Sequence, residues 1–372
     1  MLGSSPRAQP HDRRVQPPNA FRATEKAFKA YRDARQVQPL PEFLDFERPH
    51  PAAPADAGGL AAQQRPAAIA TPVAVSELAP PWLRDAQIFS IDGVDGFRFI
   101  RSPLSAAAQL RLARSALREW VEPPAATNLA LHDPSGAHDR LWERHQREPT
   151  GSLFSKLTWA TVGYQYQWTE RVYDPERRSP FPEELSRLSA DLAAACGWRV
   201  RPEAAIVNLY GPSSAMGGHR DDAEPCQSVP IVSISIGLDA IYLLGRETKE
   251  HAPIAMRLRS GDVVVQGGAS RGYVHGVPRV LADSLPAALA ATSGRDAEGG
   301  DGAEADEEAA ADLEAVRGWL SGHRLNINVR QCFDADEGRN GGEGAASEAE
   351  ARREQKRRRV CDGETSLMDH DR

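Results

Sequence analysis

The sequence has few cysteines and no long apolar run, and these two shortages exclude several classes of protein. Four cysteines occur among 372 residues, and their spacing matches neither a zinc-binding nor a disulfide pattern. No apolar stretch approaches the roughly 20 residues that a membrane-spanning helix needs. We therefore expect a globular protein of a reducing compartment, with no membrane partner.

Net positive charge is also missing, because the chain has a formal net charge of -7. Residues 283–314 account for this balance, since they hold ten acidic residues against a single arginine. The remainder of the chain is slightly basic. Charge alone therefore neither favours nor excludes a nucleic-acid substrate.

The composition divides the chain into three parts. Residues 1–80 are predicted to be an N-terminal extension, with a short amphipathic helix over 19–36. Ala and Pro dominate residues 48–82, which are typical of a linker. A catalytic domain is expected over 81–335, followed by a tail over 336–372 that is disordered in composition.

Two segments of biased composition stand out from this plan. Residues 281–322 are rich in Ala, Gly and acidic side chains and are predicted to be an insertion at a surface loop, helical over 303–320. Residues 351–360 hold six basic residues, a pattern typical of a nuclear-localisation signal.

The pattern of apolar residues favours an α+β fold. Helices are predicted over 104–121 and 183–196, and a succession of short strands follows Val200. These strands are expected at 231–238, 240–245, 253–259, 262–268 and 324–333. Short strands in succession, with helices only before them, indicate a double-stranded β-helix (jelly roll) core with supporting N-terminal helices.

A set of three side chains suits a divalent metal. His219 and Asp221 follow a Gly-rich turn, and residues i and i+2 of an extended chain point to the same side. His275 supplies a third ligand, which completes the two-histidine, one-carboxylate triad of non-haem iron oxygenases. Three coordination positions stay open for a cosubstrate and dioxygen. The alternatives are a chance H-x-D pair, an ordinary loop histidine at 275, and a zinc hydrolase.

The last predicted strand carries an unusual polar face. Alternation places Arg324, Asn326, Asn328 and Arg330 on one side and three aliphatic residues on the other. An edge strand with a solvated face is one interpretation. However, arginine and asparagine without acidic neighbours fit a dianion such as 2-oxoglutarate, because guanidinium groups bind carboxylates through paired hydrogen bonds.

Taken together, these motifs resemble the AlkB family of Fe(II)- and 2-oxoglutarate-dependent dioxygenases. The stretches 158–168, 193–198, 252–265 and 275–281 are similar to the AlkB homologue 1 branch, and the likeness spans roughly 85–335. It implies oxidative demethylation of N-methylated bases in tRNA, DNA or both, with Fe(II), 2-oxoglutarate and O2. The stacked target base would have to be flipped or unpaired. Oligomeric state is left open.

The resemblance also implies residue roles. His219, Asp221 and His275 match the iron ligands. The 2-oxoglutarate contacts are matched by Asn208, Tyr210, Arg324, Asn326 and Arg330, and Asn328 shares their strand face. Residues expected to contact the nucleotide are Trp159, Tyr164 and Glu224, although core packing is the alternative for the two aromatics.

Two other functions compete with this interpretation. One is a dioxygenase that hydroxylates or demethylates protein side chains, such as those of histones. The other is a non-catalytic nucleic-acid-binding module, which would need neither triad nor clamp. The basic cluster favours the nucleus, with the cytoplasm as a further location. The acid-poor N-terminus keeps a mitochondrial location as an alternative.

Overall fold

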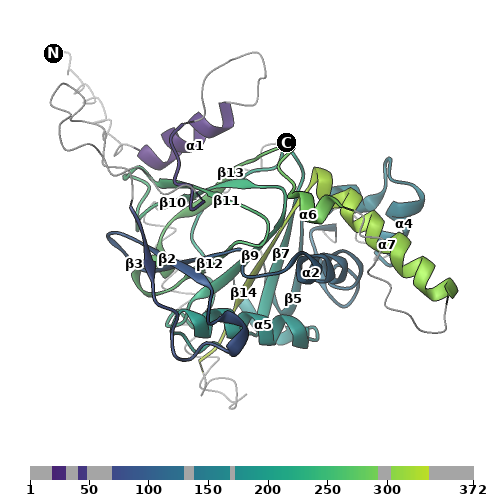
Figure 1. The fold of residues 1–372 in the computed structure, drawn as a ribbon, viewed down its shortest axis with the longest axis horizontal. Helices are drawn as coiled ribbons and strands as arrows, with labels where there is room; N and C mark the ends of the chain where they lie inside the picture. The colour runs from purple at the N-terminus through teal and green to yellow at the C-terminus, as the bar shows by residue number, and fades with distance from the viewer. Residues whose placement is uncertain are drawn as a thin grey trace, which may run out of the picture.

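Two antiparallel sheets form the centre of the protein in a computed structural model (Figure 1). The structure describes residues 19–30, 41–47, 69–129, 138–167, 172–291 and 303–334. In spatial order the large sheet holds β1 (Ala70–Val73), β2 (Gln87–Ile91), β3 (Val94–Arg101), β12 (Val263–Gln266), β9 (Ile231–Gly237), β14 (Arg324–Arg330), β7 (Ala204–Tyr210), β5 (Trp159–Gln167) and β4 (Ala126–Thr127), with β6 (Val172–Arg178) paired to β5. The small sheet holds β11 (Ile254–Leu258), β10 (Ala240–Leu244), β13 (His275–Val280) and β8 (Met216–His219). This arrangement confirms the jelly-roll prediction.

The predicted last strand lies in the middle of the large sheet. β14 pairs with β7 on one side and with β9 on the other. Its aliphatic residues Leu325, Ile327 and Val329 are fully buried in the main apolar core, which also includes Leu117 of α2 (Ala106–Arg118) and Leu192 of α5 (Glu183–Ala195). Its polar residues therefore face the small sheet. The interpretation of this segment as an edge strand with a solvated face is wrong, because β14 is paired on both sides.

The small sheet brings two distant histidines together. β13 runs antiparallel to β8, and His275 is the direct cross-strand partner of His219. Directly paired residues project to the same face of a sheet, so both imidazoles point the same way. The two histidines are thus neighbours in space although they lie 56 positions apart in the sequence.

An N-terminal helix supports this sheet. α1 (Ala20–Ala30) buries Phe21 and Phe28 against β10 and β11, as its predicted amphipathic character requires. A Cβ at Gly218 would come within 2.4 Å of the Phe21 ring, so only glycine fits there. The predicted continuation of this helix over 31–36 lies outside the described residues.

Helices cover the outer face of the large sheet. They are α2 (Ala106–Arg118), α4 (Leu141–Arg147), α5 (Glu183–Ala195), α6 (Ala287–Ala290) and α7 (Ala303–Gly322), with short 3-10 turns η1 (Pro81–Leu83) and η2 (Leu153–Lys156). A third 3-10 turn, η3 (Gly268–Gly272), lies between β12 and β13 in the chain. α2 and α5 confirm two predicted helices. None of the described helices has both the length and the apolar character needed to cross a membrane.

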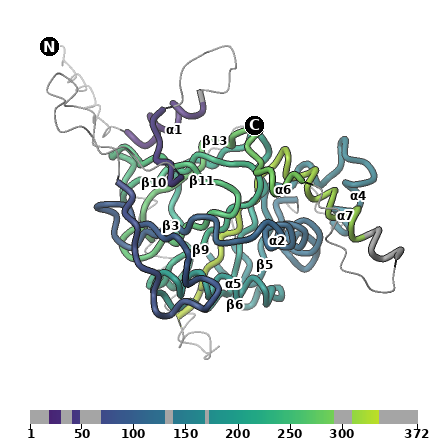
Figure 2. The backbone as a smooth tube through the Cα atoms, viewed as in Figure 1, coloured from purple at the N-terminus to yellow at the C-terminus, as the bar shows by residue number. Residues whose placement is uncertain are grey.

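The predicted insertion is more than a surface loop. Its helical part, α7, lies beside α2 and α6 (Figure 2). Val316 and Leu320 are fully buried in the main core. Asp312 accepts hydrogen bonds from Arg114 Nε at 2.6 Å and Trp142 Nε1 at 3.0 Å, and pairs with Arg118 Nη1 at 2.9 Å. One carboxylate thus joins α7 to α2 and α4.

The structure departs from the sequence prediction before residue 200. β1 lies inside the predicted linker, and β2, β3, β5 and β6 were not expected there. β5 contains Gly163 at φ +77°, where a Cβ would come within 2.0 Å of the Glu203 carbonyl oxygen. A side chain at position 163 would therefore clash with the neighbouring backbone, so only glycine fits there. The basic cluster at 351–360 lies outside the described residues, and the nuclear location that it favours stays a prediction.

We expect Asp312→Ala to destabilise the protein by about 3 kcal/mol, because it leaves two arginines and a buried indole N–H without their shared acceptor. Urea unfolding followed by circular dichroism measures the loss. Glu314→Ala is the matched control, since Glu314 lies on the same helix but is exposed. Equal losses in the two variants would show that Asp312 does not anchor α7.

A second prediction concerns Asp262, in the turn before β12. Burial raises the pKa of its carboxyl to about 7, although the amides of Arg259 and Ser102 donate to it. The folded state therefore holds this proton more tightly than the unfolded chain does. The contribution of Asp262 to the free energy of unfolding falls as pH rises from about 4 through about 7. Asp262→Asn removes the charge. Its stability relative to wild type should improve by up to about 4 kcal/mol between pH 4 and pH 8. A difference that does not vary with pH would contradict this.

Candidate functional site

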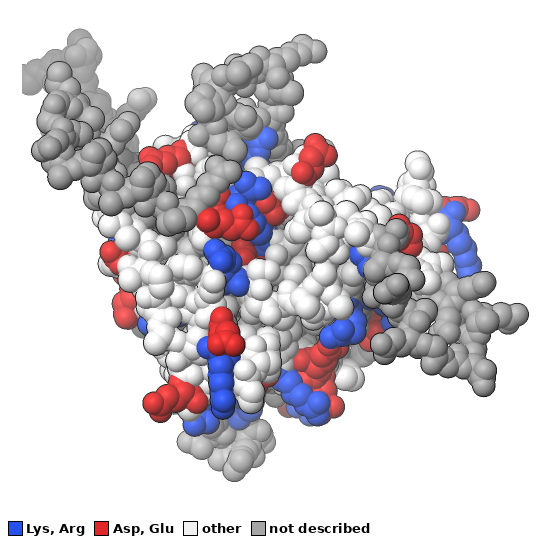
Figure 3. All heavy atoms as spheres, viewed as in Figure 1, with Lys and Arg blue, Asp and Glu red and all other residues white. Residues whose placement is uncertain are grey.

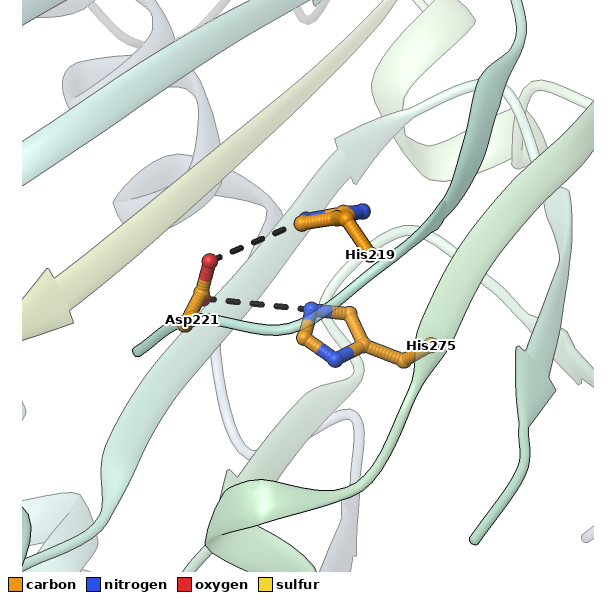
Figure 4. Close-up of side chains that lie close together, drawn as sticks. All are labelled: His219, Asp221 and His275. Atoms are coloured by element: carbon orange, nitrogen blue, oxygen red, sulfur yellow. Dashed lines mark ion pairs between the residues drawn. The ribbon is translucent and has the colours of Figure 1, made fainter. Parts of the chain in front are cut away.

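His219, Asp221 and His275 converge on one point, as Figure 4 shows. His219 ends β8, Asp221 lies two residues further on, and His275 begins β13. The Asp221 carboxylate lies 3.7 Å from His219 Nε2 and 3.8 Å from His275 Nε2. One ligand atom from each residue lies within 4.8 Å of the other two. The three side chains that the sequence singled out are therefore brought together.

Both imidazoles are held in the form that binds metal. His219 Nδ1 lies 2.9 Å from the Gly217 carbonyl oxygen, and His275 Nδ1 lies 3.2 Å from that of Tyr273. A carbonyl can only accept, so each Nδ1 carries a hydrogen, and Nε2 is the nitrogen of each ring that faces Asp221. Burial and the neighbouring His219 lower the pKa of His275 to about 4, which keeps this ring neutral.

Asp221 is ionised despite its position. Burial alone would raise the pKa of this carboxyl, but Arg330 and the two histidines more than compensate and hold it well below its usual value. Arg330 Nη2 lies 3.4 Å from Asp221 Oδ2. A carboxylate oxygen beside two imidazole Nε2 atoms is a suitable donor set for Fe(II).

Arg324 is a buried cation that lacks a carboxylate. Its side chain is fully buried and makes no ion pair with any described residue. Its hydrogen bonds go to Ser235 Oγ at 2.6 Å and to the Leu238 carbonyl at 3.1 Å, while Nε finds no partner among the described residues. Because a buried unpaired charge is costly, this guanidinium calls for an anionic ligand.

The other predicted cosubstrate contacts line the same face. Asn208 and Tyr210 of β7 lie directly opposite Asn326 and Arg324 in the β7–β14 ladder. Asn208 Nδ2 is buried without a described partner, whereas Asn326 Nδ2 donates to Ser233 Oγ at 2.8 Å. Asn328 is half-buried on this face. Unsatisfied donors of this kind fit a bound dicarboxylate such as 2-oxoglutarate.

The predicted nucleotide contacts are placed less directly. Trp159 is half-buried and is the cross-strand partner of Asn208, which puts it on the polar face. Tyr164 is also half-buried and packs edge-to-face on Phe333 with ring centroids 4.8 Å apart. Its cluster includes Ala223, close to the metal ligands. Substrate contact by either ring stays a prediction.

Glu224 has a position that the sequence did not suggest. Its side chain is 0% exposed, and its two oxygens bind Arg330 at 2.8 Å and Arg271 at 2.9 Å. It therefore has no free edge to offer a substrate, and its predicted nucleotide contact gains no support. Arg271 and Tyr173, whose hydroxyl lies 3.3 Å from Arg330 Nη1, were missed.

Comparison with known proteins agrees with this geometry. The 2OG-Fe(II) oxygenase superfamily matches residues 97–330. This chain belongs to that family. It is 32% identical to the Homo sapiens nucleic acid dioxygenase ALKBH1 over 342 residues, covering 86% of this chain and 85% of the relative.

Two further relatives cover 66% of this chain each. The tRNA demethylase abh1 of Schizosaccharomyces pombe is 30% identical, with 82% of its own length covered. The DNA N(6)-methyladenine demethylase ALKBH1A of Arabidopsis thaliana is 33% identical, with 78% covered. The chain is thus an AlkB-type dioxygenase, and members of its superfamily use Fe(II), 2-oxoglutarate and O2.

We expect Arg324→Lys to raise the dissociation constant of 2-oxoglutarate by more than about tenfold, because an ammonium cannot offer the paired donors of a guanidinium. Anaerobic titration calorimetry on the Mn(II)-loaded protein measures this constant. Arg246→Lys is a control, since Arg246 lies near the surface and binds the Gly93 carbonyl. Unchanged affinity in the Arg324 variant would remove this residue from the cosubstrate site.

Proposed function

We propose that this protein oxidatively demethylates N-methylated bases of nucleic acid. In the overall reaction, the N-methyl base, O2 and 2-oxoglutarate give the free base, formaldehyde, succinate and CO2. The buried, unpaired Arg324 beside a complete metal triad is the observation that supports a 2-oxoglutarate-dependent oxidation. The nucleic-acid substrate is supported by the activities for which the relatives are named.

The chain's own residues bind and orient the reactants. His219, Asp221 and His275 would hold the iron, which supplies the oxidising power together with O2 and 2-oxoglutarate. Arg324 and Asn208 would fix the cosubstrate through charge-assisted and neutral hydrogen bonds. The side chains of the triad are at most 16% exposed, so bulk water has limited access. A buried centre of this kind protects the reaction from side oxidation.

The substrate base has to leave its stack to reach this centre. We propose that Trp159 and Tyr164 receive the displaced base, because aromatic faces stack on bases of any sequence. On the face in Figure 3, basic and acidic side chains are interspersed. Phosphate binding on that face would therefore use individual basic residues rather than one positive surface.

Purified protein with Fe(II), 2-oxoglutarate and methylated tRNA or unpaired DNA should release formaldehyde in step with loss of the methylated nucleoside, both followed by mass spectrometry. His219→Ala should abolish turnover, because a metal ligand is lost. His251→Ala should retain it, since His251 is exposed on a loop.

Turnover without 2-oxoglutarate, or in His219→Ala, would contradict the proposed chemistry. Turnover of a methylated histone peptide but not of either nucleic acid would instead identify the protein-directed alternative. Comparing tRNA with DNA shows which polymer the enzyme prefers.

A further inference from the structure

Four charged side chains form a network that includes the metal ligand Asp221. Asp221 and Glu224 supply two carboxylates, and Arg271 and Arg330 supply two guanidiniums. Arg271, Arg330 and Glu224 are each at most 4% exposed at the side chain, and Asp221 is 15% exposed. Charges this deeply buried are tolerated only when they balance, and here two negative groups meet two positive ones.

Glu224 is the centre of the network. Its Oε1 accepts from Arg330 Nη1 at 2.8 Å and its Oε2 accepts from Arg271 Nη2 at 2.9 Å. Arg330 comes from β14 and Arg271 from η3, so one carboxylate fixes two guanidiniums from different parts of the chain. Arg330 in turn reaches Asp221 with its Nη2.

Arg271 connects the two segments that carry the metal ligands. It precedes His275 by four residues, and its Nη1 donates to the backbone carbonyl of Asp221. The same guanidinium therefore contacts the Asp221 main chain and, through Glu224, the arginine next to the Asp221 carboxylate. Neither Arg271 nor Glu224 is among the predicted metal or 2-oxoglutarate contacts.

The balance has a consequence for ligands of opposite sign. Without Arg271, the network would carry one excess negative charge, and Arg330 would be more fully neutralised by Glu224 and Asp221. Without the Glu224 charge, the network would carry one excess positive charge. A unit charge about 6 Å away in a protein interior shifts binding by tenfold or more. A metal cation and a dicarboxylate would feel that shift in opposite directions.

We propose that Arg271 and Glu224 are a positioning pair that sets the relative affinities of the site for its metal and for 2-oxoglutarate through Asp221 and Arg330. This inference rests on the proposed 2-oxoglutarate chemistry and is independent of which nucleic acid is the substrate. Binding measurements without turnover therefore test it separately from demethylation.

The test uses the full chain with Mn(II) as the metal and anaerobic titration calorimetry for both ligands. Arg271→Met should weaken 2-oxoglutarate binding by about tenfold or more while Mn(II) binding holds or tightens. Glu224→Gln should weaken Mn(II) binding by about tenfold while 2-oxoglutarate binding holds or tightens. The double variant restores neutrality, so both constants should return to within about threefold of wild type.

Two controls separate charge from packing. Arg271→Lys keeps the charge but cannot make both contacts, and it should bind 2-oxoglutarate much more tightly than Arg271→Met. Arg259→Met breaks another arginine–carboxylate pair, the bidentate one with Asp45 at 2.7 and 2.8 Å, away from the triad. It should lower the thermal unfolding temperature and leave both dissociation constants unchanged.

The proposal is overturned if both single variants weaken metal and 2-oxoglutarate together, since that is the result of a merely loosened site. It is equally overturned if the double variant is no better than the singles, or if Arg271→Lys is as weak as Arg271→Met. Should Arg271→Met fail to fold, the Mn(II) dissociation constants of Glu224→Gln and Arg271→Lys can still be compared. Because Arg271→Lys keeps both charges, this comparison shows whether losing the Glu224 charge weakens metal binding.

Discussion

The pairing of His219 with His275 across β8 and β13 is the constraint on which the site depends. Cross-strand partners share a face, so this register alone brings two ligands together with ring centroids 4.5 Å apart. The backbone carbonyls beside each ring then select its tautomer, and Tyr242 stacks on His275 at 5.9 Å. Asp221 needs only to follow His219 by two residues to complete the set.

The large sheet contributes two buried arginines that face inwards. Arg324 and Arg330 occupy the two ends of β14, and their hydrogen-bond partners differ in charge. Arg330 is balanced by Asp221 and Glu224, whereas Arg324 meets neutral oxygens of Ser235 and Leu238. Arg330 thus already has carboxylate partners in the protein, whereas Arg324 has none among the described residues, and 2-oxoglutarate contact by Arg330 stays a prediction.

The sequence was informative wherever function and periodicity coincide. The i, i+2 pair His219 and Asp221, the Arg/Asn face of β14 and the strands β9 to β12 follow from local spacing, whereas β7, β8 and β13 were not predicted and His275 was added from the ligand chemistry and the family resemblance. Arg271 and Glu224 could not be paired in this way, because an ion pair between positions 47 residues apart leaves no local pattern. The docking of α7 was missed for a different reason: its acidic composition hid Val316 and Leu320, which have the spacing of a buried helical face.

The central position of β14 also limits how such an enzyme can be redesigned. Alternate residues of this one strand belong to the hydrophobic core and to the cosubstrate site, and six of its seven positions, all but Arg330, have a cross-strand partner on both sides. A shift of a single residue would exchange the two sets. Altered cosubstrate preference is therefore easier to engineer at the partners Ser233 and Ser235 on β9 than within β14 itself.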